Sequence, residues 1–330
     1  MKNLLKLLFF TACIGLFTGC EKQDEIVAPD ALLKKTTIVN HEAPGLDHER
    51  FVTMKETGLN IHYRIIGKGP IDMVFIPGWT NPHTVYSKQF DYFRDKARCI
   101  YIDLPGTGWS DAPSPATPIK PDATGPQYTM ELMAEAMYTV IKKEGIHKFV
   151  GVGFSMGPKV LAMFERQNPG MMYKLIVIDG WLNPWPTDPE ERTALIQNNN
   201  DTYNFMLTWD SNIKSVLVKN LIPDFLSGPD AEELKEWGSY FADFPTDIMA
   251  NTGYYVRDEY VNSIVNWDYP KLCFFSSPLN EEKTNLADLV FPNNTIIIYE
   301  GGGHVIQWMF HDDMNMEIWN FVKDRPGKKY

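Results

Sequence analysis

The chain has 330 residues, of which 44% are hydrophobic and 22% are charged, and its formal net charge is −11. This is the composition of a globular protein, and a chain of this length buries enough surface to fold without disulfides or a structural metal. The acidic balance argues against nucleic acid as a partner, because phosphate backbones are bound by clustered Lys and Arg.

The N-terminus has the pattern of an export signal. A short basic start precedes residues 7–17, an apolar run that is too short to span a bilayer. The run leads into Phe17-Thr18-Gly19-Cys20, which resembles the lipobox of bacterial lipoproteins, with Phe17 where Leu is usual. The resemblance implies that the signal peptide 1–19 is removed and that a lipid on Cys20 anchors the protein to a membrane of a bacterial envelope. The alternative is an ordinary signal and a secreted or periplasmic soluble protein.

We predict that residues 20–50, which lack apolar periodicity, form a lipid-anchored tether. From residue 51 onward, short apolar runs alternate with helix-like stretches. Strands are predicted at 51–56, 59–66, 71–76, 99–102, 148–153, 175–178, 272–275 and 295–299, and helices at 83–96, 128–143, 155–167 and 313–323. This alternation predicts the α/β class, with a mostly parallel sheet and helices on both of its faces.

The alternation stops between residues 181 and 267. This stretch is rich in aromatic residues, is interrupted by prolines and has helical pieces but no convincing buried strand. It is too long for an ordinary loop. We therefore predict a helical lid at 181–267, inserted into a core made of residues 51–180 and 268–330.

The segment Gly153-Phe154-Ser155-Met156-Gly157 directly follows a predicted strand and opens a predicted helix. In that setting G-x-S-x-G is a sharp strand-to-helix turn that holds the serine exposed and strained. A helix N-terminus beneath the serine also favours developing negative charge. Ser155 is therefore the predicted nucleophile.

With this motif the chain resembles the α/β-hydrolase superfamily from about residue 51 to its end. Asp103-Leu104-Pro105-Gly106-Thr107-Gly108-Trp109-Ser110 matches the family pattern D-x-x-G-x-G-x-S, in which the Asp has a structural role. Phe75-Ile76-Pro77-Gly78-Trp79 lies where family members carry His-Gly, with Pro77 in place of His. The resemblance implies that the main-chain N–H groups of Trp79 and Met156 form the oxyanion hole.

The catalytic base should follow the last strand, and Gly301-Gly302-Gly303-His304 does so. The glycines allow an unusual backbone path there. His304 is therefore the predicted base, whereas His83, near the oxyanion loop, is a candidate pocket residue.

The acid has two candidate positions. Most family members place it after the strand at 272–275, where this chain has Ser-Ser-Pro-Leu-Asn and then Glu281 and Glu282 in what looks like a first helical turn. Asp179 follows the preceding strand, and sites in open α/β sheets form at the carboxyl ends of strands. We predict Ser155, His304 and Asp179 as the triad, with Glu281 or Glu282, or no acid at all, as alternatives.

The lid should select the substrate, and its aromatic residues are candidates for an apolar pocket. The pocket residues we predict are Trp181, Trp185 and Trp209. Cys99 and Cys273 lie in apolar runs and are expected to be buried, although a disulfide between them is possible. No Cys or His spacing indicates a metal site, and no cofactor is expected.

These residues predict a serine hydrolase that cleaves a small or medium apolar carboxylic ester through an acyl-enzyme. A lactonase, an amidase, a C–C hydrolase or a cofactor-free haloperoxidase would use the same triad. From another class, a non-catalytic, surface-anchored binding protein on a hydrolase fold remains an alternative. Substrate identity and oligomeric state are not determined by the motifs.

Overall fold

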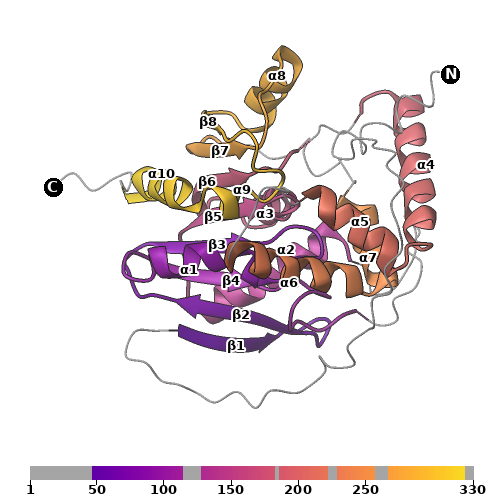
Figure 1. The fold of residues 1–330 in the computed structure, drawn as a ribbon. Helices are drawn as coiled ribbons and strands as arrows, with labels where there is room; N and C mark the ends of the chain where they lie inside the picture. Colours follow the sequence, from indigo (N-terminus) through magenta and orange to yellow (C-terminus); the bar gives the residue numbers. More distant parts are fainter. Residues whose placement is uncertain (1–46, 114–127, 183–185, 222–228, 257–266, 324–330) are drawn as a thin grey trace.

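The computed structural model describes residues 47–113, 128–182, 186–221, 229–256 and 267–323. In these residues, eight strands form one sheet in the order β1-β2-β4-β3-β5-β6-β7-β8 (Figure 1). The strands are β1 Asp47–Thr53, β2 Asn60–Ile66, β3 Asp72–Ile76, β4 Arg98–Ile102, β5 Phe149–Phe154, β6 Met172–Ile178, β7 Lys271–Phe275 and β8 Asn294–Ile298. β2 pairs antiparallel with β1 and β4, and the remaining neighbours pair in parallel. The predicted fold class is confirmed.

The helices lie mainly between the parallel strands and in one long insertion between β6 and β7. They are η3 His83–Tyr86, α1 Ser87–Phe93, α2 Met130–Lys143, α3 Gly157–Gln167, α4 Pro189–Met206, α5 Ser211–Leu221, α6 Pro229–Asp243, α7 Thr246–Val256, α8 Glu281–Val290, α9 Ile306–Met309 and α10 His311–Lys323.

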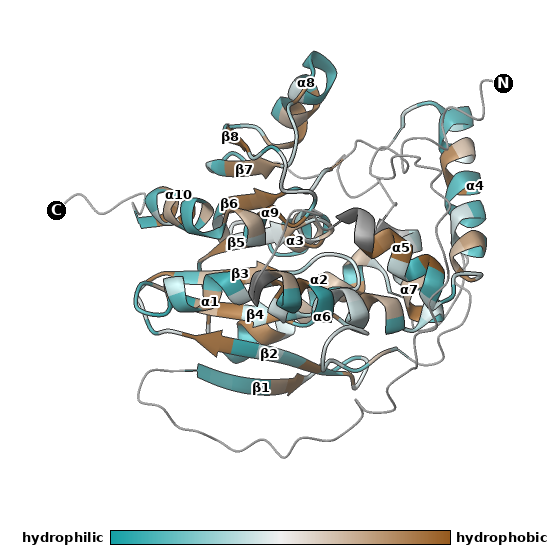
Figure 2. Cartoon of the chain, viewed as in Figure 1, coloured by the Kyte–Doolittle hydropathy of each residue, from teal (hydrophilic) through white to brown (hydrophobic). Residues whose placement is uncertain are grey.

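Strand β3 shows how the sheet builds two cores. Its alternate residues point to opposite faces, so Val74 packs with α2 and α3 on one side, whereas Phe75 packs with α1 and α10 on the other. The central strands are hydrophobic on both faces (Figure 2), as expected of a parallel sheet covered by helices. Each fully buried large side chain of this kind stabilises the fold by roughly 1.5–3 kcal/mol.

Local signals fix the ends of α2. The Thr129 side chain accepts a hydrogen bond from the main-chain N–H of Leu132, which satisfies one of the free donors of the first turn. Glu131 lies in the first turn, and Lys142 and Lys143 lie in the last, so their charges complement the helix dipole. The helix therefore begins at Met130, two residues inside the predicted range.

Two boundaries differ from the sequence-based expectation. β1 begins at Asp47, inside the range predicted as tether, because the Asp47 carboxylate accepts hydrogen bonds from Arg64 on β2 at 2.7 and 2.8 Å. The helix predicted at 83–96 divides into η3 and α1. The break is at Tyr86, whose φ of −103° and ψ of 17° lie outside the helical region.

The inserted helices α4 to α7 occupy most of the range predicted as a lid; residues 183–185, 222–228 and 257–266 of that range lie outside the described residues. α4 packs on α7, and α5 packs on α6. Tyr240 on α6 and Thr252 on α7 accept hydrogen bonds from Gly108 and Trp79, in the loops that follow β4 and β3. The inserted helices therefore cover the carboxyl ends of the parallel strands.

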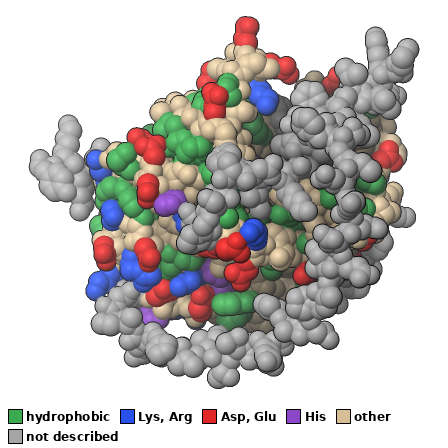
Figure 3. All heavy atoms as spheres, in the orientation of Figure 1, with side chains coloured by type: hydrophobic (Ala, Val, Ile, Leu, Met, Phe, Trp, Pro, Cys, Tyr) green, Lys and Arg blue, Asp and Glu red, His purple; other side chains and the backbone are tan. Residues whose placement is uncertain are grey.

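The surface and the cysteines fit an ordinary globular domain. On the face drawn in Figure 3, Lys and Arg side chains lie among Asp and Glu. Cys99 and Cys273 are both buried and free. Within the described ranges, none of the helices combines the length and the apolar character that crossing a membrane requires.

Candidate active site

Ser155 lies in the turn between β5 and α3. Its φ is 55°, a left-handed conformation that residues other than glycine rarely adopt. The turn is held by the main-chain N–H of Ser155, which donates to the carbonyl of Ile178 on the neighbouring strand at 2.9 Å. This is the strained exposed turn expected for G-x-S-x-G.

The structure brings Ser155, His304 and Asp179 into a continuous hydrogen-bonded row. Nε2 of His304 lies 2.9 Å from Oγ of Ser155, and Nδ1 of His304 lies 2.6 Å from Oδ2 of Asp179. The His304 side chain is 25% exposed and that of Asp179 is 12% exposed, and Ser155 is partly exposed. This order allows His304 to take a proton from Ser155 while Asp179 fixes the imidazole tautomer.

Asp179 is placed by the strands on both sides of it. It follows β6 with a φ of 43°, and its main-chain N–H donates to the carbonyl of Phe274 on β7 at 2.8 Å. Its Oδ1 accepts from the main-chain N–H of Ser276 at 3.0 Å, while Oδ2 faces His304. The two oxygens therefore have separate partners, and the carboxylate cannot rotate without losing one.

His304 follows β8 in a loop whose glycines take left-handed conformations, with φ of 84° at Gly301 and 59° at Gly303. The imidazole packs on the ring of Phe154, with 4.8 Å between ring centroids. Backbone path and packing together point the ring at the serine turn.

Glu281 and Glu282, the alternative acids, lie in the first turn of α8. The side chain of Asn280 caps this helix by accepting from the N–H of Lys283 at 2.8 Å. Both glutamates are exposed, where they complement the N-terminal end of the helix dipole. The carboxylate beside His304 is that of Asp179.

The loop after β3 approaches the serine closely. A Cβ added to Gly78 would lie 3.0 Å from Cβ of Ser155, so this position needs a glycine. Trp79 is the next residue, and Met156 follows Ser155 at the start of α3, with only 2% exposure. The two residues predicted to supply the oxyanion donors are thus the chain neighbours of Gly78 and Ser155, which lie against each other.

The predicted pocket tryptophans have different environments. Trp181 stacks on Phe275 at 4.4 Å between ring centroids. Trp209 is 6% exposed and packs edge-on against Trp79 at 6.5 Å. Trp185 lies outside the described residues, as does Cys20.

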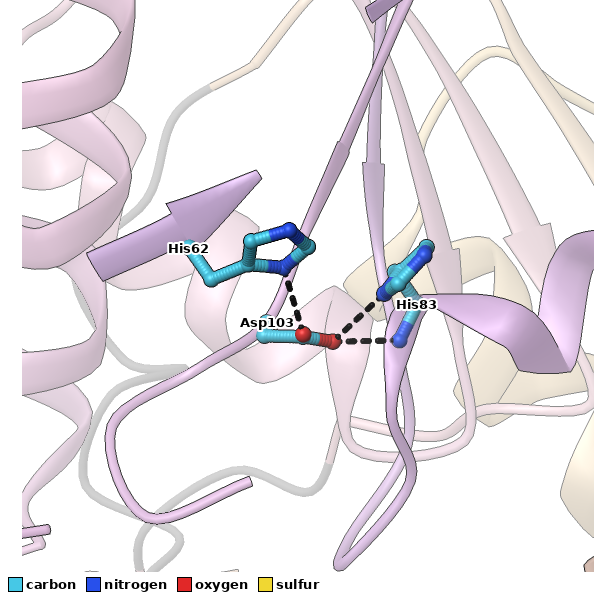
Figure 4. Close-up of side chains that lie close together, drawn as sticks. All are labelled: His62, His83 and Asp103. Atoms are coloured by element: carbon cyan, nitrogen blue, oxygen red, sulfur yellow. Dashed lines mark hydrogen bonds and ion pairs between the residues drawn. The ribbon is translucent and has the colours of Figure 1, made fainter. Parts of the chain in front are cut away.

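A second polar cluster joins β2, the residue after β4 and the start of η3. Asp103, fully buried, faces His62 and His83, whose Nδ1 atoms lie 2.7 and 3.0 Å from its oxygens (Figure 4). The D-x-x-G-x-G-x-S motif indicated a structural role for Asp103 but did not indicate these two histidines as its partners. His83, predicted as a pocket candidate, is 3% exposed and bonds Asp103 instead.

His62, His83 and Asp103 have ligand atoms within 4.8 Å of one another, the spacing of a possible metal site. However, Asp103 also accepts main-chain N–H bonds from His83 at 2.6 Å and Trp109 at 3.0 Å. Four donors thus converge on the two oxygens, which is the full capacity of a carboxylate. The donor set fits a hydrogen-bonded ion cluster and not a cation site.

The charges within the cluster stabilise one another. Burial alone would raise the pKa of Asp103, but the charge of His83 and the hydrogen bonds from both histidines outweigh burial and leave it below its ordinary value. Burial alone would lower the pKa of His62, but Asp103 and Glu49 outweigh it, and the net pKa is raised. Nε2 of His62 lies 2.7 Å from Oε2 of Glu49. Asp103 and Glu49 thus favour the protonated form of His62.

The model of the alpha/beta hydrolase fold family matches residues 73–255, more than half of the chain. The chain therefore belongs to the α/β-hydrolase family. This family assignment agrees with the sheet order and with a nucleophile turn after β5.

Individual relatives are distant. The chain is 30% identical over 122 residues to protein PHYLLO of Arabidopsis thaliana, a match that covers 34% of this chain and 7% of that protein. It is 28% identical over 131 residues to epoxide hydrolase 3 of Xenopus tropicalis, covering 39% of this chain and 33% of that protein. The chain therefore spans only a minor part of the length of these relatives. An esterase from Thermogutta terrifontis has the same fold, with a TM-score of 0.66, 19% identity and coverage of 84% of this chain and 98% of that one.

Proposed function

We propose that the protein hydrolyses a small or medium apolar carboxylic ester through an acyl-enzyme. The observation that carries this proposal is the row from Ser155 through His304 to Asp179, with distances of 2.9 and 2.6 Å. A serine hydroxyl becomes an effective nucleophile only when a base and an orienting acid are aligned in this way.

In the proposed mechanism, Oγ of Ser155 attacks the ester carbonyl while Nε2 of His304 accepts its proton. The main-chain N–H groups of Trp79 and Met156 stabilise the oxyanion, and His304 then donates the proton to the leaving alcohol. Water attacks the acyl-enzyme with His304 again as base and releases the acid. Asp179 stays ionised and supports the imidazolium.

The nucleophile argues against epoxide hydrolysis, the activity in the name of the Xenopus relative. Attack of a serine hydroxyl on an epoxide carbon would form an ether, which has no carbonyl for water to attack and would not turn over. An ester instead gives an acyl-enzyme that the same base can hydrolyse. Lactones, amides and C–C bonds next to a carbonyl, and haloperoxidase chemistry, remain open to the same triad.

We propose further that residues 1–19 direct export and that a lipid on Cys20 anchors the mature enzyme to an envelope membrane. The support is the apolar run followed by the lipobox-like residues 17–20. The tether up to β1 would then hold the catalytic domain near the membrane surface.

The test is covalent labelling with a fluorophosphonate probe, followed by a series of p-nitrophenyl esters of graded acyl length. We expect the wild type to be labelled and to turn over short or medium esters, and Ser155→Ala to lose both while remaining folded by circular dichroism. A folded wild type that is neither labelled nor active on esters, lactones or amides would favour a non-catalytic binding protein.

A further inference from the structure

Trp79 belongs to two parts of the molecule at once. Its main chain lies in the loop after β3, directly after Gly78, which approaches Ser155. Its indole reaches the inserted helices, where Nε1 donates to Oγ1 of Thr252 on α7 at 2.8 Å. One residue therefore links the predicted oxyanion loop to the lid.

The hydrogen bond to Thr252 is well defined. The Thr252 hydroxyl has one proton, which it donates within its own helix, to the carbonyl of Ile248 at 2.8 Å or that of Met249 at 3.1 Å. Its oxygen lone pairs are then free to accept from Trp79. The second acceptor for the indole, the Met249 carbonyl, is more distant at 3.2 Å. Thr252 is 2% exposed, so water does not replace its hydroxyl.

Packing fixes the same indole from other directions. The rings of Trp209 and Phe241 lie edge-on to it at 6.5 and 6.1 Å. On α7, a Cβ added to Gly253 would lie 3.0 Å from Cζ2 of Trp79. Helix α7 thus contacts the indole through a hydrogen bond and through close backbone packing.

The loop holds a strained conformation at Thr80, next to Trp79. Thr80 has a φ of 61°, a strained conformation for a residue with a β-branched side chain. Its hydroxyl bonds only to the carbonyl of the preceding residue, Trp79, at 2.6 Å, and the N–H of Asn81 bonds back to Gly78 at 3.1 Å. Both bonds are internal to the loop. Outside the loop, Gly78 packs against Ser155 and His83 bonds to Asp103, and between them the Trp79 indole is the contact that reaches the lid.

We propose that Thr252 is a positioning residue: its hydroxyl holds the Trp79 indole and thereby aims the Trp79 main-chain N–H at the oxyanion. This inference rests on the proposed ester hydrolysis. If Thr252 has this role, transition-state stabilisation depends on the position of α7 relative to the loop after β3, because an oxyanion donor is effective only when it is pre-aligned. The lid then does more than enclose the substrate.

The test compares Thr252→Val with the wild type on the best p-nitrophenyl ester. Valine keeps the size and removes the acceptor. We expect kcat to fall roughly three- to tenfold, the effect of one neutral hydrogen bond, with KM within about twofold of wild type. Affinity for a trifluoromethyl ketone, whose serine adduct carries an oxyanion, should fall by the same factor. Thr252→Ser should restore both.

Tyr240→Phe is the matched control, because it removes another hydrogen bond between the lid and the core, from the exposed Gly108 N–H at 3.0 Å, without touching Trp79. We expect it to leave kcat and ketone affinity unchanged. Equal losses in Tyr240→Phe and Thr252→Val would mean that lid docking in general matters, and would overturn the proposal.

A double-mutant cycle tests whether Trp79 and Thr252 act through one bond. Where Thr252→Val folds poorly, Trp79→Phe alone serves as the test and should lower kcat and ketone affinity as Thr252→Val would. Trp79→Phe removes the donor of the same bond, so the double variant Trp79→Phe with Thr252→Val should lose no more kcat than Trp79→Phe alone. Additive losses would overturn the proposal, as would an unchanged kcat in folded Thr252→Val. A wild type with neither turnover nor fluorophosphonate labelling would overturn the proposed function itself, and this inference with it.

Discussion

The carboxylate of Asp179 lies 2.6 Å from Nδ1 of His304, which is 125 residues further along the chain. The strand where the family usually carries this acid is β7, which separates β6 from β8 in the sheet. Ser276, just after β7, contributes a main-chain N–H to the other oxygen of Asp179. The residue after β7 thus supports the carboxylate of Asp179, which follows the neighbouring strand.

Asp179→Asn should therefore lower kcat by roughly 10³- to 10⁴-fold, because an amide cannot hold the same imidazole tautomer or stabilise the imidazolium. Asparagine tolerates a positive φ, so the fold should persist. Steady-state kinetics with a p-nitrophenyl ester would measure the loss, and thermal unfolding would check stability. Glu281→Gln, in the exposed first turn of α8, is the control and should keep full activity. A near-normal rate in Asp179→Asn would exclude the assignment.

The cluster at Asp103 should give stability a distinct pH dependence. Asp103 and Glu49 raise the pKa of His62 in the folded state above its ordinary value of 6.5. Its contribution to stability is therefore complete below pH 6.5 and is lost as the pH rises through the folded-state pKa. His62→Gln should destabilise the protein by roughly 3 kcal/mol at pH 6, because it removes the imidazole between the buried Asp103 carboxylate and the partly exposed Glu49 carboxylate. Urea unfolding from pH 6 to 9 should show the gap to wild type narrowing. A constant or widening gap would contradict the prediction.

Lys271 should have the opposite effect on the pH dependence of stability. Its ammonium is buried, donates to the carbonyls of Trp267, Tyr269 and Pro292, and has a pKa lowered to about 8 by burial. In the unfolded chain the pKa of Lys271 is near 10.5, so the unfolded state binds more protons than the folded state between pH 8 and 10.5. Stability should therefore rise with pH across this window. Relative to Lys271→Met, the wild type should gain roughly 1–3 kcal/mol from pH 8 to 10.5 in urea unfolding. Parallel pH profiles of the two proteins would refute this.

The proposed anchor is tested at Cys20. In a bacterial host, the wild type should sediment with membranes and incorporate radiolabelled palmitate, whereas Cys20→Ser should lose the label. Cys99→Ser, which changes a buried cysteine of β4, is the control and should keep it. Labelling that persists in Cys20→Ser would rule out this site of lipidation.

The sequence by itself predicted the strands of the sheet, with a later start for β1, and two residues of the hydrogen-bonded row. Apolar runs predicted the parallel strands because burial on both faces requires continuous hydrophobic residues. Ser155 and His304 were predictable since each follows a strand within a glycine-containing turn that leaves a local pattern. Asp179 was one candidate for the acid and Glu281 or Glu282 was the other, because both positions follow strands that end at the same edge of the sheet.

Only the tertiary structure shows which of these carboxylates lies beside His304, since this depends on which strand end faces the loop after β8. It also brought His62 and His83 to Asp103, and Thr252 to Trp79. The residues of each pair lie in separate elements, so no motif or regular spacing in the sequence indicates that they meet. The distance between their side chains is set by how the helices and strands pack, which a local pattern does not encode.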